Sequence, residues 1–260
     1  MGLIWSPPGL GKHRRCVLGV LTSNLVLSFY EAVGSQGKWA RVAIVNGVLG
    51  SHFQYLDLEE GLMLRKTMIR SFAWCPPLKA PVAGADDSPY SIPNSESRWG
   101  IQLLAVTNDD NDVIFLRVQR SQTDASPPGS YALELLTVTS LSDSEDNYPM
   151  VCPGSVICTT LKRHIKASSV SCGPWLTAKQ QDTGSVTSNA AITYGSNLKI
   201  VQLDVILTHQ GQGSGLQSQY KTVASSEENT TISQDLNKCH FQGPFQWLYK
   251  VSIDIVTRLP

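Results

Sequence analysis

Short apolar runs separated by polar turns dominate this chain and predict β-hairpins. Residues 17–21 and 25–29 are apolar and β-branched, and the polar turn Thr22-Ser23-Asn24 joins them. Residues 113–118 form a similar run after a turn rich in Asn and Asp, whose side chains readily hydrogen-bond to nearby backbone. A further turn at 194–197 joins another pair of apolar runs. Runs of this length with such turns are typical of antiparallel strands.

The hairpins belong to a longer pattern that occurs in two full copies and one degraded copy. In the full copies a tryptophan precedes two prolines, and the apolar hairpin follows after a spacer. In the degraded copy Ser171-Cys172-Gly173-Pro174-Trp175 takes the place of this start. A repeated unit of strand, loop and hairpin indicates a blade of a β-propeller. The residues of this repeat signature are Trp5, Pro7, Pro8, Trp74, Pro76, Pro77 and Trp175.

The predicted fold class is all-β, a partial WD40-like β-propeller of about three blades with long polar loops between strands. Further strands are expected at 39–46, 68–74, 131–139 and 165–170, and the single helical candidate covers 58–70. A closed ring takes roughly 4–8 blades, which predicts that the chain is part of a larger propeller or a truncated gene model. The blade-like units cover approximately 1–56, 57–141 and 165–226, with the start of a further blade at 243–256.

Several polar stretches between these units predict disordered surface loops. They are rich in Pro, Ser, Asp, Gly and Gln, and they cannot bury enough apolar surface to offset the entropy of ordering. The expected loops are residues 79–97, 121–130, 140–147 and 211–229.

Charge and cysteine content narrow the function classes. The 21 basic and 21 acidic residues cancel, so the chain lacks the broad positive field of a protein that holds nucleic acid by itself. Lys12, Arg14 and Arg15 form a local basic segment, which is either a solvated loop or a contact for nucleic acid or an acidic partner. The six cysteines show no paired spacing and are read as reduced thiols in an intracellular protein. No apolar run approaches the length of a membrane span, so no membrane partner is expected.

The sequence predicts no catalytic residues, no cofactor and no metal site. Gln210, Gly213 and Gly215 fit the Q-x-x-G-x-G pattern with which acetyltransferases hold the pyrophosphate of acetyl-CoA. Their surroundings are a low-complexity Gln/Gly/Ser stretch, which favours a flexible loop over this cofactor site. The five histidines lack metal-ligand spacing, and the aspartates of 109–112 lack the remaining ligands of a calcium loop.

Residues 5–28, 69–77 and 103–118 together resemble the N-terminal WD40-like propeller of the delta subunit of transcription factor IIIC, particularly its fungal members. The resemblance covers 1–118 and extends around 170–205. It implies a subunit of the nuclear complex that recognises internal promoters of tRNA genes and recruits the RNA polymerase III machinery. The implied partners are other subunits of that complex and polymerase III initiation factors, with DNA contacted only indirectly.

The same resemblance leaves two functions open. The first is a non-catalytic scaffold that binds other subunits through its sheets and loops. The alternative is a histone acetyltransferase, an activity credited to some members of the family. Family members generally carry more propeller before the motif at Trp5 and a C-terminal zinc-binding region, which this sequence is not expected to supply.

Overall fold

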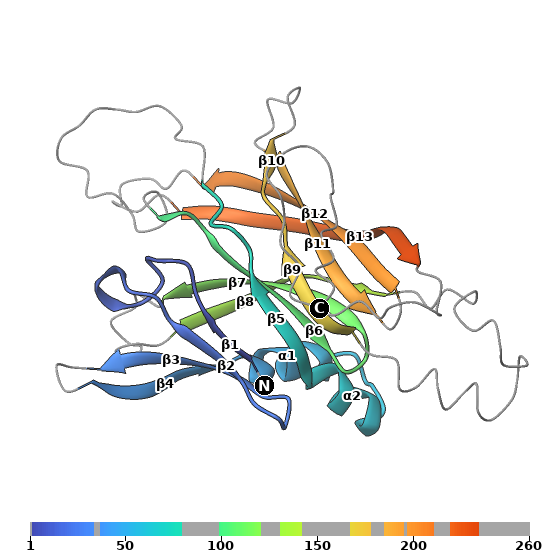
Figure 1. Ribbon diagram of the computed structural model, residues 1–260, viewed down its shortest axis with the longest axis horizontal. Coiled ribbons are helices and arrows are strands. Elements are labelled where there is room, and N and C mark those ends of the chain that lie inside the picture. The colour runs from blue at the N-terminus through green and yellow to red at the C-terminus, as the bar shows by residue number, and fades with distance from the viewer. Residues whose placement is uncertain are drawn as a thin grey trace, which may run out of the picture.

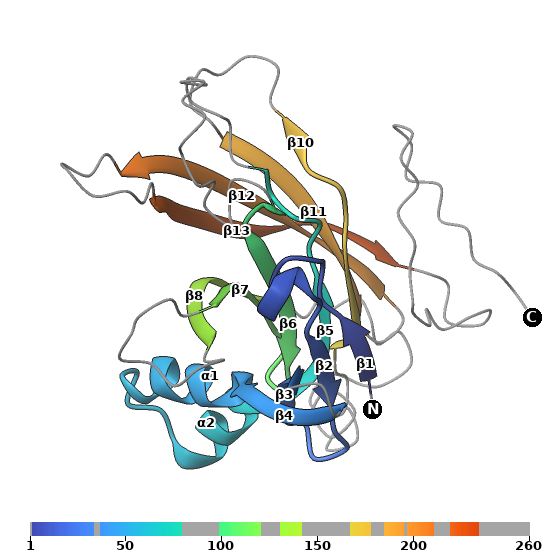
Figure 2. The same ribbon diagram turned by 90° about the vertical axis from the view of Figure 1, so that its left-hand side faces the viewer.

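In the part of the chain that the structure describes, the strands form three antiparallel sheets that follow one another along the sequence (Figures 1 and 2). Neighbouring sheets pack face to face, the second between the first and the third. The computed structural model describes residues 2–33, 37–79, 99–120, 131–141, 167–177, 185–194, 197–210 and 219–233.

The first sheet confirms the hairpin and the further strand expected near the N-terminus. A short 3₁₀ turn, η1 (Lys12–Arg14), lies in the loop after the first strand. Thr22 and Leu25 close the hairpin turn through a Leu25 N–H to Thr22 C=O hydrogen bond of 3.0 Å. The strands lie in the order β1 (Gly2–Trp5), β2 (Leu18–Leu21), β3 (Leu27–Val33) and β4 (Lys38–Ile44).

The second sheet lies in the middle of the stack. All seven residues of its second strand are buried, because both faces of that strand are covered by other sheets. This explains why its residues 103–106 form a continuous apolar run in place of an alternating one. The strands lie in the order β5 (Ile69–Trp74), β6 (Gln102–Asn108), β7 (Asp112–Arg120) and β8 (Tyr131–Ser140).

The third sheet is larger than the sequence predicts. Its last strand occupies most of the stretch expected to be a disordered loop at 211–229, so that expectation is wrong from residue 219 onward. The strand pairs along its whole length with the apolar strand before it, and this pairing satisfies its backbone whatever the side chains are. Residues 211–218 lie outside the described part. The strands are β9 (Ala167–Cys172), β10 (Leu176–Thr177), β11 (Ser185–Tyr194), β12 (Asn197–Gln210) and β13 (Gln219–Ser233).

Other expectations fall on residues that the structure does not describe. These are the further strand at 243–256 and the loops at 80–97, 121–130 and 142–147; of the loop ends, Lys79, Ser140 and Leu141 are described.

Two α-helices occur among the described residues, α1 (Val45–Gln54) and α2 (Glu60–Thr67). The second lies within the predicted helical stretch 58–70. The first is absent from the sequence prediction, because Gly47 and Gly50 lower its intrinsic helix propensity. Its apolar side chains pack between the first and second sheets, and this tertiary contact stabilises the helix. The buried residues of α1 are Val45, Leu49 and Phe53.

The apolar core has two layers, one on each side of the second sheet. One layer joins the first and second sheets and includes α1, and the other joins the second and third sheets. At the first interface Phe72 of β5 packs directly on Gly19 of β2, where a Cβ atom would lie 2.7 Å from the Phe72 ring. Three sheets stacked around two apolar layers confirm the predicted all-β class.

Candidate interaction surface and polar sites

The face of the first sheet that points away from the second sheet carries several exposed apolar side chains. The strand register places Trp5, Leu18, Tyr30 and Arg41 in one row across this face, which we call the outer face. The neighbouring row runs from Leu3 through Val20 and Ser28 to Ile44. The most exposed apolar side chains on the outer face are Leu3 (70%), Trp5 (53%), Trp39 (51%) and Ile44 (41%).

The register also shows which residues of the repeat are structurally equivalent. Trp5 ends β1 opposite Leu18, and Trp74 ends β5 opposite Leu104. In each case the next residue donates its backbone N–H to the neighbouring strand, from Ser6 at 2.8 Å and from Cys75 at 2.9 Å. The two full copies of the signature therefore occupy the same position in their sheets.

The degraded copy differs from the prediction. Cys172 ends β9 opposite Ala190, and the next residue, Gly173, donates its N–H to the neighbouring strand at 2.7 Å. The position of Trp5 and Trp74 is therefore taken by Cys172, and Trp175 lies three residues further along the chain. The indole N–H of Trp175 reaches across to the carbonyl of Pro76 at 2.6 Å.

The equivalent positions face the preceding sheet. Trp74 packs on Phe29 of the first sheet with ring centroids 5.4 Å apart. Cys172 contacts Cys75 of the second sheet, with 3.2 Å between the sulfur atoms. Trp5 contacts Trp39 of its own sheet, at 5.8 Å between centroids, and no sheet in the described part of the chain lies on its other side. The outer face of the first sheet thus presents the kind of side chain that makes an inter-sheet contact elsewhere, and no sheet among the described residues packs against it.

The prolines of the signature follow the ends of β1 and β5. The hydroxyl of Ser6 donates to the carbonyl of Pro7 at 2.9 Å, and Pro8 follows in the same turn. Pro77 precedes Leu78, whose N–H pairs with Ile101 at 3.0 Å. A proline lacks a backbone N–H, which suits a position where strand pairing ends.

The basic segment covers η1 and the residue after it, and Glu31, which no local sequence pattern connects with this segment, binds its backbone. Lys12 and Arg15 are exposed, and for Arg14 only the backbone is described. The backbone N–H of Lys12 donates to the carboxylate of Glu31, which is only 5% exposed. Tyr131 of the second sheet donates its hydroxyl to the same carboxylate at 3.2 Å. Burial and the neighbouring Glu31 raise the pKa of Tyr131.

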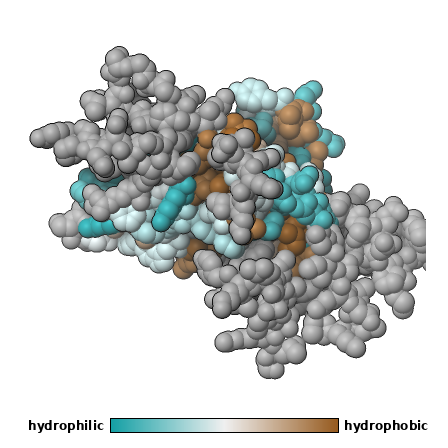
Figure 3. All heavy atoms as spheres, turned by 90° about the horizontal axis from the view of Figure 1, so that it is seen from above, coloured by the Kyte–Doolittle hydropathy of each residue, from teal (hydrophilic) through white to brown (hydrophobic). Residues whose placement is uncertain are grey.

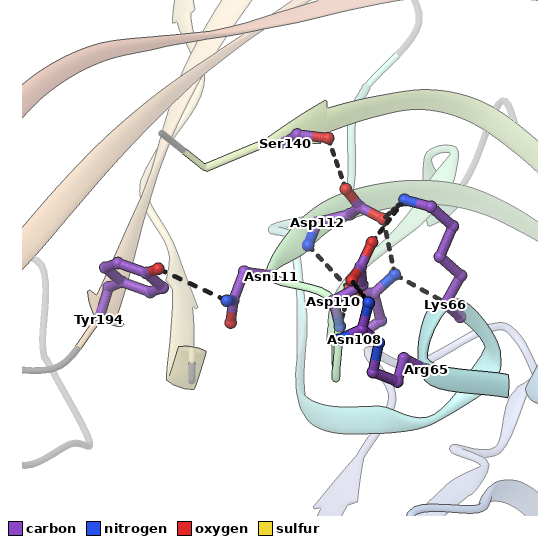
Figure 4. A network of polar contacts seen from close by, with 8 residues as sticks. All are labelled: Arg65, Lys66, Asn108, Asp110, Asn111, Asp112, Ser140 and Tyr194. Atoms are coloured by element: carbon purple, nitrogen blue, oxygen red, sulfur yellow. Dashed lines mark hydrogen bonds and ion pairs between the residues drawn. The ribbon is translucent and has the colours of Figure 1, made fainter. Parts of the chain in front are cut away.

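A second polar cluster surrounds the turn between β6 and β7 (Figure 4). The carboxylate of Asp112 is buried and accepts hydrogen bonds from Lys66 Nζ (2.8 Å), Asn108 Nδ2 (2.8 Å) and Ser140 Oγ (2.5 Å). Asn108 also accepts from the backbone N–H of Asp112 at 2.8 Å. These bonds tie α2 to both β7 and β8. The aspartates of 109–112 act here as structural turn residues, as the sequence predicts.

Lys66 was not anticipated from the sequence, because it lies 46 positions before Asp112. Its ammonium group also pairs with Asp110 at 2.9 Å. Burial by itself would lower the pKa of Lys66, but the bonds to Asp112 and Asp110 outweigh burial and the pKa is raised. The cluster also reaches the third sheet, because Asn111 donates to the Tyr194 hydroxyl at 3.5 Å (Figure 4).

The hairpin of β12 and β13 does not supply the context of an acetyl-CoA site. Gln210 is the last residue of β12 and pairs with Gln219 of β13, while Gly213 and Gly215 lie outside the described residues. A pyrophosphate cradle of the expected type needs a helix start after the loop. Here an antiparallel strand follows from residue 219.

The described residues contain no group of three or more His, Cys, Asp or Glu side chains placed to hold a metal ion. None of their helices has both the length and the apolar character that crossing a membrane requires.

Comparison with known proteins identifies the family. The chain matches the family model of the transcription factor IIIC subunit delta beta-propeller domain over residues 1–258. No curated protein matches the chain. Because the family match covers nearly the whole sequence and all three sheets, the chain belongs to the transcription factor IIIC delta family, and the predicted β-propeller fold is confirmed.

Proposed function

We propose that this member of the delta family is a non-catalytic scaffold subunit of transcription factor IIIC that acts in initiation by RNA polymerase III at tRNA-type promoters. The family supports membership of a transcription complex. In this proposal the chain works in the nucleus, and its partners are other subunits of the complex and polymerase III initiation factors. Its zero net charge favours indirect contact with promoter DNA through those partners.

The observation that carries the proposal is the exposed outer face of the first sheet. Contiguous exposed apolar residues on a protein surface mark an interaction site. The second copy of the repeat indicates what the position of Trp5 contacts, because the equivalent Trp74 packs on Phe29 of the preceding sheet. The occupant we propose is a β-sheet of a partner subunit that presents a large apolar side chain to Trp5. Arg41, exposed on the same face, favours a carboxylate at the rim of that partner.

The outer side of the third sheet, at the opposite end of the stack, is more polar, which favours the first sheet as the binding surface. On the third sheet, the side facing away from the second sheet carries Thr187, which donates to Asp204 at 2.6 Å, and Gln202, which donates to the same carboxylate at 2.9 Å. Figure 3, which views the molecule from the side where β10–β13 lie, shows hydrophilic and hydrophobic residues intermixed there. Exposed Ile206 and Val223 lie among these polar groups.

The test is reconstitution with the other subunits of the complex. Tagged chain is co-expressed with them, and the subunits that co-purify are quantified for three forms of the chain. Trp5→Ser with Trp39→Ser removes the aromatic pair of the outer face, and we expect at least a tenfold loss of binding, because buried aromatic residues dominate interface energy. The control, Ile206→Ser with Val223→Ser, removes exposed apolar side chains of the third sheet and leaves binding unchanged.

The outcomes separate the function from the surface. A wild-type chain that co-purifies with no other subunit overturns the scaffold role. A Trp5→Ser/Trp39→Ser variant that folds, as judged by circular dichroism, and binds as tightly as the wild type overturns the assignment of the outer face and leaves the scaffold role standing.

A further inference from the structure

Two cysteines meet where the second and third sheets pack together. Cys75 directly follows β5, and Cys172 is the last residue of β9. These strands lie side by side although the cysteines are 97 positions apart in sequence (Figures 1 and 2). The Cys75 thiol donates a hydrogen bond to the sulfur of Cys172, with 3.2 Å between the two sulfur atoms.

Both cysteines are held in place by their own sheets. The N–H of Cys75 donates to Leu103 at 2.9 Å. Cys172 pairs with Ala190, and the residue after it donates its N–H to the same strand at 2.7 Å. Across the joint, the Trp175 indole donates to the carbonyl of Pro76 at 2.6 Å. The sulfur atoms are therefore adjacent because the backbones on both sides are fixed.

We propose that Cys75 and Cys172 form a modification site, at which a small-molecule disulfide such as oxidised glutathione converts the two thiols into a disulfide between the sheets. Both are free thiols in this structure. The proposal is independent of the scaffold role, because it needs no partner subunit.

The reaction consists of two thiol–disulfide exchanges. Cys172 is half-buried and Cys75 is 1% exposed, so the reagent reaches Cys172 first. The Cys172 thiolate attacks one sulfur of oxidised glutathione, breaks its S–S bond and releases one glutathione thiolate. The Cys75 thiolate then attacks the Cys172 sulfur of this mixed disulfide and releases the second glutathione. The two protons lost by the protein thiols go to the two released thiolates, and oxidised glutathione is reduced as the protein is oxidised.

The second exchange is the slow one. The hydrogen bond to Cys172, together with burial, raises the pKa of the Cys75 thiol well above its usual range. The thiolate is the attacking species, so the raised pKa slows this second exchange near neutral pH. Raising the pH increases the thiolate fraction and accelerates formation of the disulfide.

The disulfide has a measurable consequence for stability. It closes a long loop that contains parts of the second and third sheets, and a long closed loop removes much entropy from the unfolded chain. We expect the Tm of the oxidised protein to rise by roughly 10 °C over the reduced protein.

The experiment incubates the folded full-length chain with oxidised glutathione, blocks the remaining thiols and maps peptides without reduction. We expect a linked peptide that contains Cys75 and Cys172, lighter by two hydrogen atoms than the sum of the two reduced peptides. Cys75→Ala and Cys172→Ser each abolish both this peptide and the rise in Tm. Cys16→Ser, at a half-buried cysteine in the loop before β2, is the matched control and leaves both unchanged.

Two results would overturn the proposal. One is a glutathione adduct on Cys172 that persists at alkaline pH without a linked peptide. The other is a Tm rise that survives in both Cys75→Ala and Cys172→Ser, which would place the stabilising bond elsewhere. Two variants are used because the loss of a buried thiol at Cys75 is itself destabilising, whereas Cys172 is partly exposed.

Discussion

At the scale of single residues, Asp112 belongs to a turn that the sequence predicts, but its side chain has a structural role that the sequence does not predict. The Asn- and Asp-rich turn predicts a hairpin, and the hairpin is present. The carboxylate at its end is 1% exposed and accepts from Lys66 of α2, which no local pattern connects with the turn. A buried charge of this kind is tolerated because it is paired and hydrogen-bonded.

Removing that carboxylate should be costly. Asp112→Ala removes the buried acceptor shared by Lys66, Asn108 and Ser140. We expect the free energy of unfolding to fall by about 3–5 kcal/mol, the usual result of breaking a buried pair. The control is Arg65→Ala, which removes a pair with Asp110 at 3.3 Å whose arginine is 45% exposed. Such pairs contribute about 0–1 kcal/mol. Urea unfolding measures the free energy of unfolding of both variants. Equal losses in the two variants would contradict the structural role of the buried Asp112 carboxylate.

At the scale of elements, local composition gives a wrong prediction where a segment is stabilised by contacts with other elements. The polar stretch before residue 229 predicts a loop, but β12 provides a complete edge for it and β13 forms. Helix α1 is hidden in sequence by two glycines, yet its apolar side chains pack against the sheets. Asn46 adds bonds from its side chain to Leu25 (2.9 Å) and Thr67 (2.6 Å).

One of the two glycines in α1, Gly47, provides a test of the helix. Gly47 has no atom within 4 Å of an added Cβ, so Gly47→Ala fits without strain. We expect it to raise the free energy of unfolding by about 0.5–1 kcal/mol, because alanine loses less backbone entropy in a helix. The contrasting variant Asn46→Ala should lower it, since three backbone groups lose a partner. A Gly47→Ala protein no more stable than the wild type, measured by thermal unfolding, would argue against a regular helix here.

At the scale of the whole molecule, the sheets are joined by particular close contacts. Gly19 permits the ring of Phe72 to lie against β2, and Phe72 is only 4% exposed. On the other side of the second sheet, Cys75 and Cys172 are adjacent and Trp175 bonds to Pro76. The outer face of the first sheet carries Trp5 at the position equivalent to Trp74 and is exposed, which is why we propose that a partner subunit binds there.

Adding a side chain at Gly19 should weaken the packing between the first two sheets. The Cβ of Gly19→Ala would lie 2.7 Å from the ring of the buried Phe72, so either the ring or the backbone of β2 must shift. Overpacking of this kind costs about 1–3 kcal/mol of unfolding free energy. Phe72→Leu in the same chain should restore part of the loss, because it vacates the space. If the two substitutions prove additive in a double-mutant cycle, the contact is not what joins the sheets.

The sequence by itself determined the hairpins, their turns, the repeat and the family, because each depends on residues within a few positions or on a pattern repeated along the chain. The helix α1, the strand β13 and the buried pair of Lys66 and Asp112 depended on the tertiary structure. So did the replacement of the signature tryptophan by Cys172 and the exposure of Trp5. Each of these is decided by contacts between segments that are far apart in the chain. Such contacts leave no local periodicity to read, and they become visible only when the sheets are stacked.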